Sequence, residues 1–293
     1  MKYLPLFLFL PLILLAQTSP GQVTADEIYI VTLNSGEIVK GNIVAESEGK
    51  ITLQSVSGLT LEIPRTAIAT MELFHGKMKE GKLYRSDPNY SRLMFAPTAR
   101  PLKKGDGYFS DYYIIFPGVS YGFTRNLTVM AGFTIIPGLG LKDQVKYIGP
   151  KFSLVNTEKY SVAIGTIYGA VSGEFGGGIS YVVGTFGSPD KSVTTGLGFG
   201  FMKAKNKKFE FAERPVIMLG GNFRLSNSLA LVTENWLFPW EEFDLDYQPF
   251  SVALRLFGDR MAVDFGAILM PVIFKEGGFP FPWLSFVYNF SRK

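Results

Sequence analysis

The sequence has no cysteine and only one histidine, His75, in 293 residues. Without cysteine the chain forms no disulfide scaffold, no thiolate metal site and no lipid-modified cysteine anchor. A single histidine excludes clustered histidine ligands and removes the usual general base of hydrolases. The glycine-rich stretch 173–178 lacks the lysine of a phosphate loop. We therefore expect no catalytic residue, no metal site and no cofactor.

Charged residues are also few, at 18%, and the net charge of +4 is too small to suggest a nucleic-acid partner. Aromatic residues make up 15% of the chain, which, together with the low charge, argues against disorder. The mean hydropathy of +0.17 is high for a soluble domain. This composition indicates a folded, apolar protein of an extracytoplasmic compartment.

Long apolar runs are absent apart from one short N-terminal stretch. Lys2 precedes an apolar segment from Leu4 to Leu15, and Ala16 offers a small residue before a cleavage point. These features predict a secretory signal peptide over 1–16. A spanning helix needs about 20 apolar residues, which weighs against the alternative of an N-terminal anchor. A mature chain that enters a membrane must therefore do so as a closed sheet.

Residues 26–73 contain five short alternating runs separated by turn residues, the pattern of consecutive hairpins. Three stretches resemble a small SH3-like or Sm-like β-barrel: Val31–Val44 (VTLNSGEIVKGNIV), Ile51–Leu53 (ITL) and Leu61–Pro64 (LEIP). The resemblance implies shape only. An RNA partner is excluded because the segment is secreted and lacks a basic patch. Two roles remain open: a packing or spacer module, and a module that binds peptidoglycan or a periplasmic protein.

Residues 74–90 read as a basic linker, with lysine and arginine among glycine and proline. A solvated linker is the simpler interpretation, and contact with anionic lipid head groups is the alternative. His75 lies in this linker and is expected to be solvated.

From residue 91 to the end, segments of about ten residues alternate between large apolar and small or polar side chains. In 250–257, for example, Phe250, Val252, Leu254 and Leu256 alternate with Ser251, Ala253 and Arg255. A soluble sandwich would carry many charges on its second face. Here the second face carries Gly, Ser, Thr and Ala, which is typical of a transmembrane β-barrel with lipid outside and a lumen inside.

Twelve segments of this kind are predicted, and ten or fourteen remain open because 108–124 is long and contains Pro117-Gly118. The predicted strands are 92–99, 108–124, 127–136, 144–155, 160–171, 177–186, 193–202, 214–224, 229–238, 249–257, 261–270 and 282–290. Short connections alternate with longer ones, beginning with a longer one at 100–107. Short turns at one rim and longer loops at the other are typical of outer-membrane barrels. An even number places both ends of the barrel at the short-turn rim.

The last segment resembles the C-terminal strand of bacterial outer-membrane β-barrel proteins. Its alternating residues are Leu284, Phe286, Tyr288 and Phe290. In that class the final residue is usually aromatic, whereas here Ser291, Arg292 and Lys293 follow. The resemblance covers 91–293 and implies two partners, outer-membrane lipid and the barrel-assembly machinery. The small domain at 26–73 is then expected in the periplasm.

Four charged residues fall on successive predicted strands and are expected to point into the lumen: Arg224, Glu234, Arg255 and Asp264. Unpaired charges are costly inside a narrow barrel, so they should pair. A bracing ladder of ion pairs is one interpretation, and a selectivity lining for a charged solute is the other.

Aromatic residues and charges cluster near the longer loops. Trp236, Phe238, Trp240 and Trp283 are predicted to form an aromatic belt at the membrane interface. One loop is basic around 203–214 and another is acidic around 241–246, so the two are able to pair or to bind ions or anionic lipid.

The sequence thus predicts an all-β protein with a small five-stranded barrel and a transmembrane barrel of about twelve strands. We expect passive passage of small solutes or a structural role in the envelope. Two alternatives stay open: a surface adhesion module acting through its outer loops, and a soluble periplasmic ligand-binding β-protein.

Overall fold

The computed structural model describes residues 27–74, 76–79, 82–171, 175–238 and 243–291. The chain divides into two compact units, Met1–Phe74 and His75–Lys293, which are treated separately. The signal peptide predicted over 1–16 lies outside the described residues. No helix in the described part of the chain is long and apolar enough to cross a membrane.

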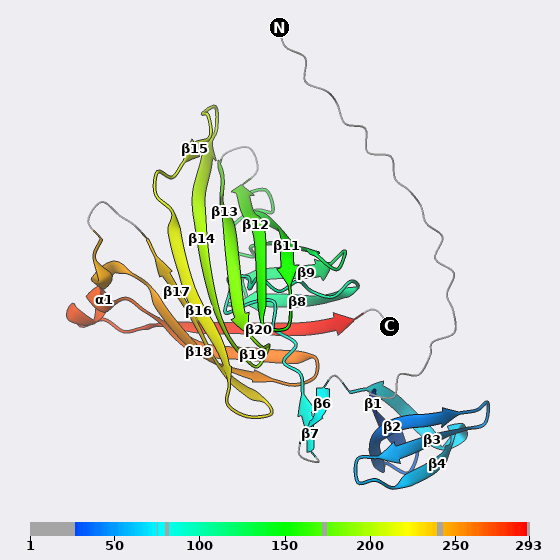
Figure 1. Cartoon of the computed structure of the whole chain (residues 1–293). Helices are drawn as coiled ribbons and strands as arrows, with labels where there is room; N and C mark the ends of the chain where they lie inside the picture. Colours follow the sequence, from blue (N-terminus) through cyan, green and yellow to red (C-terminus); the bar gives the residue numbers. More distant parts are fainter. Residues whose placement is uncertain (1–26, 75, 80–81, 172–174, 239–242, 292–293) are drawn as a thin grey trace. The chain divides into compact units, whose positions relative to one another are not determined.

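The first unit contains five antiparallel strands, as predicted, in the order β4-β3-β2-β1-β5 (Figure 1). They are β1 (Ile28–Leu33), β2 (Ile38–Glu46), β3 (Lys50–Ser55), β4 (Thr60–Pro64) and β5 (Ile68–Leu73), with the 3₁₀ turn η1 (Arg65–Ala67) before β5. Alternation places one apolar row of each strand inside, and Val31, Ile51, Leu53 and Ile63 form the core. Gly36 and Gly58 both have φ of +88° at hairpin turns, a conformation that favours glycine.

Replacing Leu53 by alanine tests whether this unit folds independently. The side chain is fully buried, so Leu53→Ala is expected to destabilise the small domain by about 2–5 kcal/mol. Proteolysis in increasing urea should then cleave the small domain at lower urea, while the barrel keeps its heat-dependent gel migration. Val44→Ala, at a 54% exposed position of the same sheet, is the control and should change stability by less than about 0.5 kcal/mol. A barrel that unfolds together with the small domain would contradict two independent units.

In the second unit, twelve antiparallel strands within the described residues form a closed barrel (Figure 1). They are β8 (Asp106–Tyr112), β9 (Phe116–Gly122), β10 (Leu127–Phe133), β11 (Lys146–Asn156), β12 (Tyr160–Val171), β13 (Phe175–Gly187), β14 (Lys191–Ala204), β16 (Val216–Arg224), β17 (Leu229–Leu237), β18 (Phe250–Phe257), β19 (Met261–Leu269) and β20 (Phe281–Ser291). Each strand pairs with its neighbour in the chain, and β20 pairs with β8 to close the ring. The short β15 (Glu210–Phe211) pairs only with the end of β14.

The predicted strand number is confirmed, but two strand assignments are wrong and their errors cancel. Residues 92–99 form no barrel strand and make only the isolated bridge between Arg92 and Pro97. The segment 108–124 contains two strands, most of β8 and all of β9, joined by a tight turn. Tyr113 and Ile114 adopt φ of +57° and +66° in this turn, which no glycine or asparagine signals in the sequence. The predicted long connection over 100–107 therefore leads into the first strand instead.

Side chains alternate across the barrel wall as the sequence predicts. On β18, Leu254 and Leu256 are 45% and 51% exposed, whereas Ala253 and Arg255 are buried. Exposed apolar side chains recur on the outward face around the barrel, among them Ile148, Phe152, Ile164, Val182, Ile217, Leu219, Phe265 and Phe286. An apolar outer band with a polar interior is the arrangement of barrels that face lipid.

The two rims differ in the length of their connections. The turns 123–126, 157–159, 188–190, 225–228 and 258–260 are short. The other rim carries the tight turn 113–115 and the longer connections, which include β15, the 3₁₀ turn η2 (Leu245–Tyr247) and the helix α1 (Pro271–Lys275). Ser291 pairs with Asp106, so both ends of the barrel lie at the short-turn rim.

The predicted linker 74–90 differs from the structure. It contains a hairpin of β6 (Gly76–Lys79) and β7 (Lys82–Arg85). Arg85 forms an ion pair with Asp259 at 2.6 Å, and its backbone N–H donates to the Asn227 side chain. Both partners lie in short turns, so the hairpin is attached to the short-turn rim.

Candidate functional site

The segment after this hairpin lies inside the barrel. Side chains at consecutive positions are buried from residue 91 to 94 and again from 98 to 102. A wall strand would alternate between buried and exposed positions, so this pattern indicates a chain surrounded on all sides. We call residues 87–102 the plug. Its backbone cannot join a sheet ladder at Pro88, Pro97 and Pro101, which lack an N–H donor.

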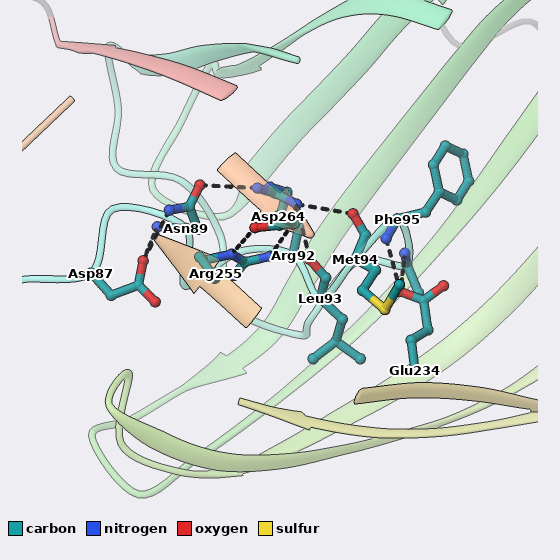
Figure 2. A network of polar contacts seen from close by, with 10 residues as sticks. Asp87, Asn89, Arg92, Leu93, Met94, Phe95, Glu234, Arg255 and Asp264 are labelled. Carbon is teal, nitrogen blue, oxygen red and sulfur yellow. Dashed lines mark hydrogen bonds and ion pairs between the residues drawn. The ribbon is translucent and has the colours of Figure 1, made fainter. Parts of the chain in front are cut away.

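Two strand residues and one plug residue form a buried ion network in the barrel interior (Figure 2). Asp264 on β19 accepts from Arg255 on β18 at 2.7 and 2.9 Å, and from Arg92 of the plug at 2.9 Å. Arg255 and Asp264 face each other directly across the two strands. Their side chains are fully buried, and that of Arg92 is 1% exposed. The sequence predicts that the inward charges pair, but it names neither this pair nor the plug partner Arg92.

The same two arginines hold the plug backbone. Arg255 donates to the carbonyl of Leu93 at 2.6 Å, and Arg92 donates to the carbonyls of Leu93 and Met94 at 3.0 and 2.9 Å. Arg92 also contacts Asn89 at 3.3 Å. The charged guanidinium groups of the network therefore hold the plug backbone at Leu93 and Met94.

Glu234 on β17 holds the tip of the plug, also seen in Figure 2. One carboxylate oxygen accepts from the backbone N–H groups of Phe95 and Ala96 at 2.8 and 2.9 Å. The other oxygen accepts from the indole Nε1 of Trp236 at 2.9 Å. One carboxylate thus links the plug to an aromatic side chain of the wall.

Lys151 on β11 is a further interior residue, which the sequence analysis missed. Its ammonium is buried and donates to the carbonyls of Ser91, Thr98 and Arg100 at 3.3, 2.7 and 2.7 Å. The signal was present in the sequence, since Lys151 shares the inward phase of its strand with Gly149 and Ser153. Lys151 is the one charged residue in the middle of the predicted strand 144–155.

Hydroxyl groups of the wall complete the contacts with the plug. Thr185 accepts from the N–H of Ala99 at 2.9 Å, and Thr128 accepts from the N–H of Leu102 at 3.0 Å. Ser153 donates to the carbonyl of Ala99 at 2.9 Å. Further small polar side chains are buried on the inward face of the strands: Ser110, Ser120, Ser161, Ser192, Thr194, Asn222 and Ser285.

Arg224, the fourth predicted lumen residue, lies apart from the other three. It ends β16 at the short-turn rim, pairs with Asp190 at 2.6 Å and covers the ring of Tyr84 at 3.9 Å. It therefore holds the β6–β7 hairpin against the rim. Arg224 belongs to the inward-facing row of β16, as predicted, but it is the last residue of the strand and lies at the rim instead of in the lumen.

The remaining predicted groups are placed as follows. Leu284, Phe286 and Tyr288 on β20 are exposed on the outer face, and Phe290 of the same phase is partly buried. Trp236 and Trp283 pack against the interior cluster around Leu93 and Met94, so they form no interfacial belt. Trp240 lies outside the described residues.

One residue of the acidic loop, Asp246, pairs with the helix α1. Lys275 at the end of α1 donates to Asp246, and this hydrogen bond raises the pKa of the Lys275 ammonium. Glu241 and Glu242 lie outside the described residues. Within the described ranges, no three acidic or histidine side chains gather as metal ligands would.

One spacing of catalytic interest was overlooked in the sequence. Residues 118–122 have the Gly-x-Ser-x-Gly pattern of hydrolase elbows. In the structure they lie within β9 and are followed by a short turn into β10, with Ser120 buried. A nucleophile elbow needs an exposed serine on a sharp strand-to-helix turn, so this serine has no such geometry.

Comparisons with known proteins give structural similarity only. No family model matches the chain, and no curated protein does. The KdgM porin in complex with disordered oligogalacturonate is 10% identical with a TM-score of 0.45, covering 64% of this chain and 98% of that one. The NanC porin is 9% identical with a TM-score of 0.39 and the same coverage. Outer-membrane expressed OmpT of Vibrio cholerae is 8% identical with a TM-score of 0.34, covering 90% and 95%. At these TM-scores the similarities carry no argument about function.

Proposed function

We propose that the chain is an outer-membrane β-barrel that passes small solutes only when the plug leaves its lumen. The apolar outer face supports the membrane location, since exposed apolar surface of this extent is unfavourable in water. The buried plug supports a closed resting state, because residues 87–102 occupy the interior. Unrestricted passive diffusion, the simpler sequence prediction, is therefore replaced by a gated form.

The wall behind the plug carries this proposal. A permanent protein core is mostly apolar, because each buried polar group needs a partner. Here the wall presents buried serine, threonine and charged side chains to the plug, beside apolar ones such as Val183, Met218 and Val232. The same groups are able to hydrogen-bond water once the plug is gone. The barrel interior is therefore suited to both a plugged and a water-filled state.

The charges of the wall are balanced without the plug. Lys151 and Arg255 carry two positive charges, and Glu234 and Asp264 carry two negative ones. Asp87, Arg92 and Arg100 leave with the plug. We therefore expect an unplugged lumen to conduct cations and anions with little preference, in contrast to a selectivity lining of one sign.

The test is conductance in a planar lipid bilayer. The protein from residue 17 onward should be silent or show rare openings. A variant with residues 87–102 replaced by a Gly-Ser linker of equal length should give discrete, reproducible current steps with weak ion selectivity. Heat-dependent gel migration controls for folding of both proteins. A folded variant that stays silent contradicts a gated lumen and favours a purely structural barrel.

The small domain stays a separate prediction. We propose that it lies in the periplasm and binds peptidoglycan or a periplasmic protein, which would anchor the barrel in the envelope. Outer-membrane lipid and the barrel-assembly machinery are the other expected partners, and we expect no enzymatic activity.

A further inference from the structure

The apolar outer face of β14 ends at a lysine on the side of the longer loops. The outward row of this strand runs from Lys191 to Lys203, and every second residue between them is apolar except Thr195. The stretch from Val193 to Phe201 is nine residues long, and a strand needs about 9–11 residues to cross a membrane. Lys203 is therefore expected at the membrane interface on the side of the longer loops.

A second lysine lies at the same level, three strands away along the wall (Figure 1). The register joins four residues into one row across β11, β12, β13 and β14: Lys146, Ala170, Gly176 and Lys203. Lys146 shares the outward phase of the exposed Ile148, and both lysine side chains are exposed. Neighbouring strands are about 4.8 Å apart, so the two lysines are about 14 Å apart along the wall. We call these four residues the lysine row, in which two cations flank a surface of small side chains.

The next outward row, one level closer to the membrane centre, is rich in aromatic rings. It contains Ile148, Tyr168, Gly178, Phe201 and Phe211, and we call it the aromatic row. The rings of Tyr168 and Phe201 stack with 6.2 Å between their centroids. The phenol oxygen of Tyr168 lies over Gly176 of the lysine row, where an added Cβ would collide with it. Phe211 is 71% exposed. Aromatic rings with a polar edge toward water are typical of the membrane interface.

The connection beyond the lysine row adds positive charge. Residues 203–214 contain five basic and two acidic residues, and one of these acids, Glu210, lies opposite Met202 on the other face of the sheet. Within the described residues, neither the lysines of this connection nor Lys146 forms an ion pair. The connection between β17 and β18 is acidic instead. The positive charge of this rim is therefore concentrated over β11–β15.

We propose that the outer face of β11–β15 binds a phosphorylated glycolipid of the membrane leaflet on the side of the longer loops. The proposal rests on the membrane location in the proposed function and not on the plug. Two cations at one level suit a head group with two phosphates, and the small side chains between them leave room for its sugar. The aromatic row lies where the acyl chains begin. A zwitterionic lipid fits less well, because its own ammonium group would face the lysines.

Binding is tested with the protein from residue 17 onward in a neutral detergent, by native mass spectrometry. Diphosphoryl lipid A is the probe, and phosphatidylcholine and inorganic phosphate are the controls. The parent protein should bind lipid A saturably and more tightly than either control. Lys203→Gln should weaken this binding by about fivefold, the effect of one basic residue at an anionic surface. Lys146→Gln combined with Lys203→Gln should weaken it by about 25-fold, whereas Lys203→Arg, which keeps the charge, should bind as the parent does.

Lys191→Gln is the matched control, because Lys191 begins the outward row of the same strand at the short-turn rim. It should bind lipid A as the parent does, and heat-dependent gel migration reports folding of every variant. Equal weakening by Lys191→Gln and Lys203→Gln overturns the proposal, as does equal affinity of the parent for lipid A and either control. A second copy of the chain bound in place of the lipid also overturns it. None of these results depends on conductance, so a failure of lipid binding is distinguishable from a failure of the gated lumen.

Discussion

Asp264→Asn is expected to lower the free energy of unfolding of the barrel by about 3–5 kcal/mol, because it leaves two buried guanidinium groups without an anion. Asp264 is the one carboxylate within 4 Å of both Arg92 and Arg255 in the described structure. Neither arginine reaches water from its place in the interior. The loss should appear as a lower urea midpoint for the heat-dependent gel shift in refolded vesicles.

Two variants separate this effect from a general loss of charge. Asp259→Asn removes the partner of Arg85 at the rim, where both side chains are about one-third exposed, and should cost less than about 1 kcal/mol. Asp264→Asn combined with Arg92→Met removes one of the two unpaired cations and should recover part of the loss. If Asp264→Asn and Asp259→Asn have equal effects, the buried network is not what stabilises the interior.

Lys151→Met is expected to shift the barrel toward its unplugged state by about 3 kcal/mol, which is more than a hundredfold in the equilibrium constant. Three plug carbonyls lose the lysine donor. The Ser91 carbonyl keeps the N–H of Thr98 at 3.0 Å, whereas those of Thr98 and Arg100 are left unsatisfied, and each buried acceptor without a donor costs about 1–3 kcal/mol. The methionine variant has no ammonium group to bury, and the desolvation cost that it avoids offsets part of this loss. In a planar bilayer the variant should show frequent current steps where the parent protein is silent.

Lys146→Met is the control for this substitution. Lys146 lies on the same strand at an exposed position near the longer loops, so its replacement should leave the conductance unchanged. A silent Lys151→Met barrel with normal gel migration would show that the plug does not depend on this lysine.

The wall of the barrel could be predicted because each strand carries its own local signal. Leu254, Arg255 and Leu256 point to alternate faces whatever their neighbours do, and the period of two is visible in the sequence. The same alternation on adjacent strands places Arg255 and Asp264 on the inward face, and the register then sets them directly opposite each other. The inward and outward faces of the strands were therefore accessible without a structure, whereas the register was not predicted and the number twelve was reached through two errors that cancel.

The plug could not be predicted because its conformation has no period. Residues 92–99 contain Leu93, Met94, Phe95 and Ala96 in a row, which resembles a short buried strand in composition. What distinguishes them is their set of wall partners, which lie between 53 and 172 residues away in the chain, from Lys151 to Asp264. Contacts between residues so far apart in the chain produce no periodic pattern in the local sequence. The tight turn at Tyr113 and Ile114 was not predicted for a related reason. The closed barrel imposes a positive φ on two residues whose types do not favour it.

The route of the plug has a mechanical consequence. It follows the hairpin that contacts Asn227 and Asp259, and it leads into Asp106, so both of its ends lie at the short-turn rim. The plug is thus a loop that enters and leaves the barrel at the same rim. It is able to withdraw without any part of the chain passing through the barrel. Tension applied to the chain ahead of the hairpin is carried first by the contacts of Arg85 and Tyr84 with the rim. Only after these contacts break does the load reach Arg92, which makes the hairpin a mechanical latch for the plug.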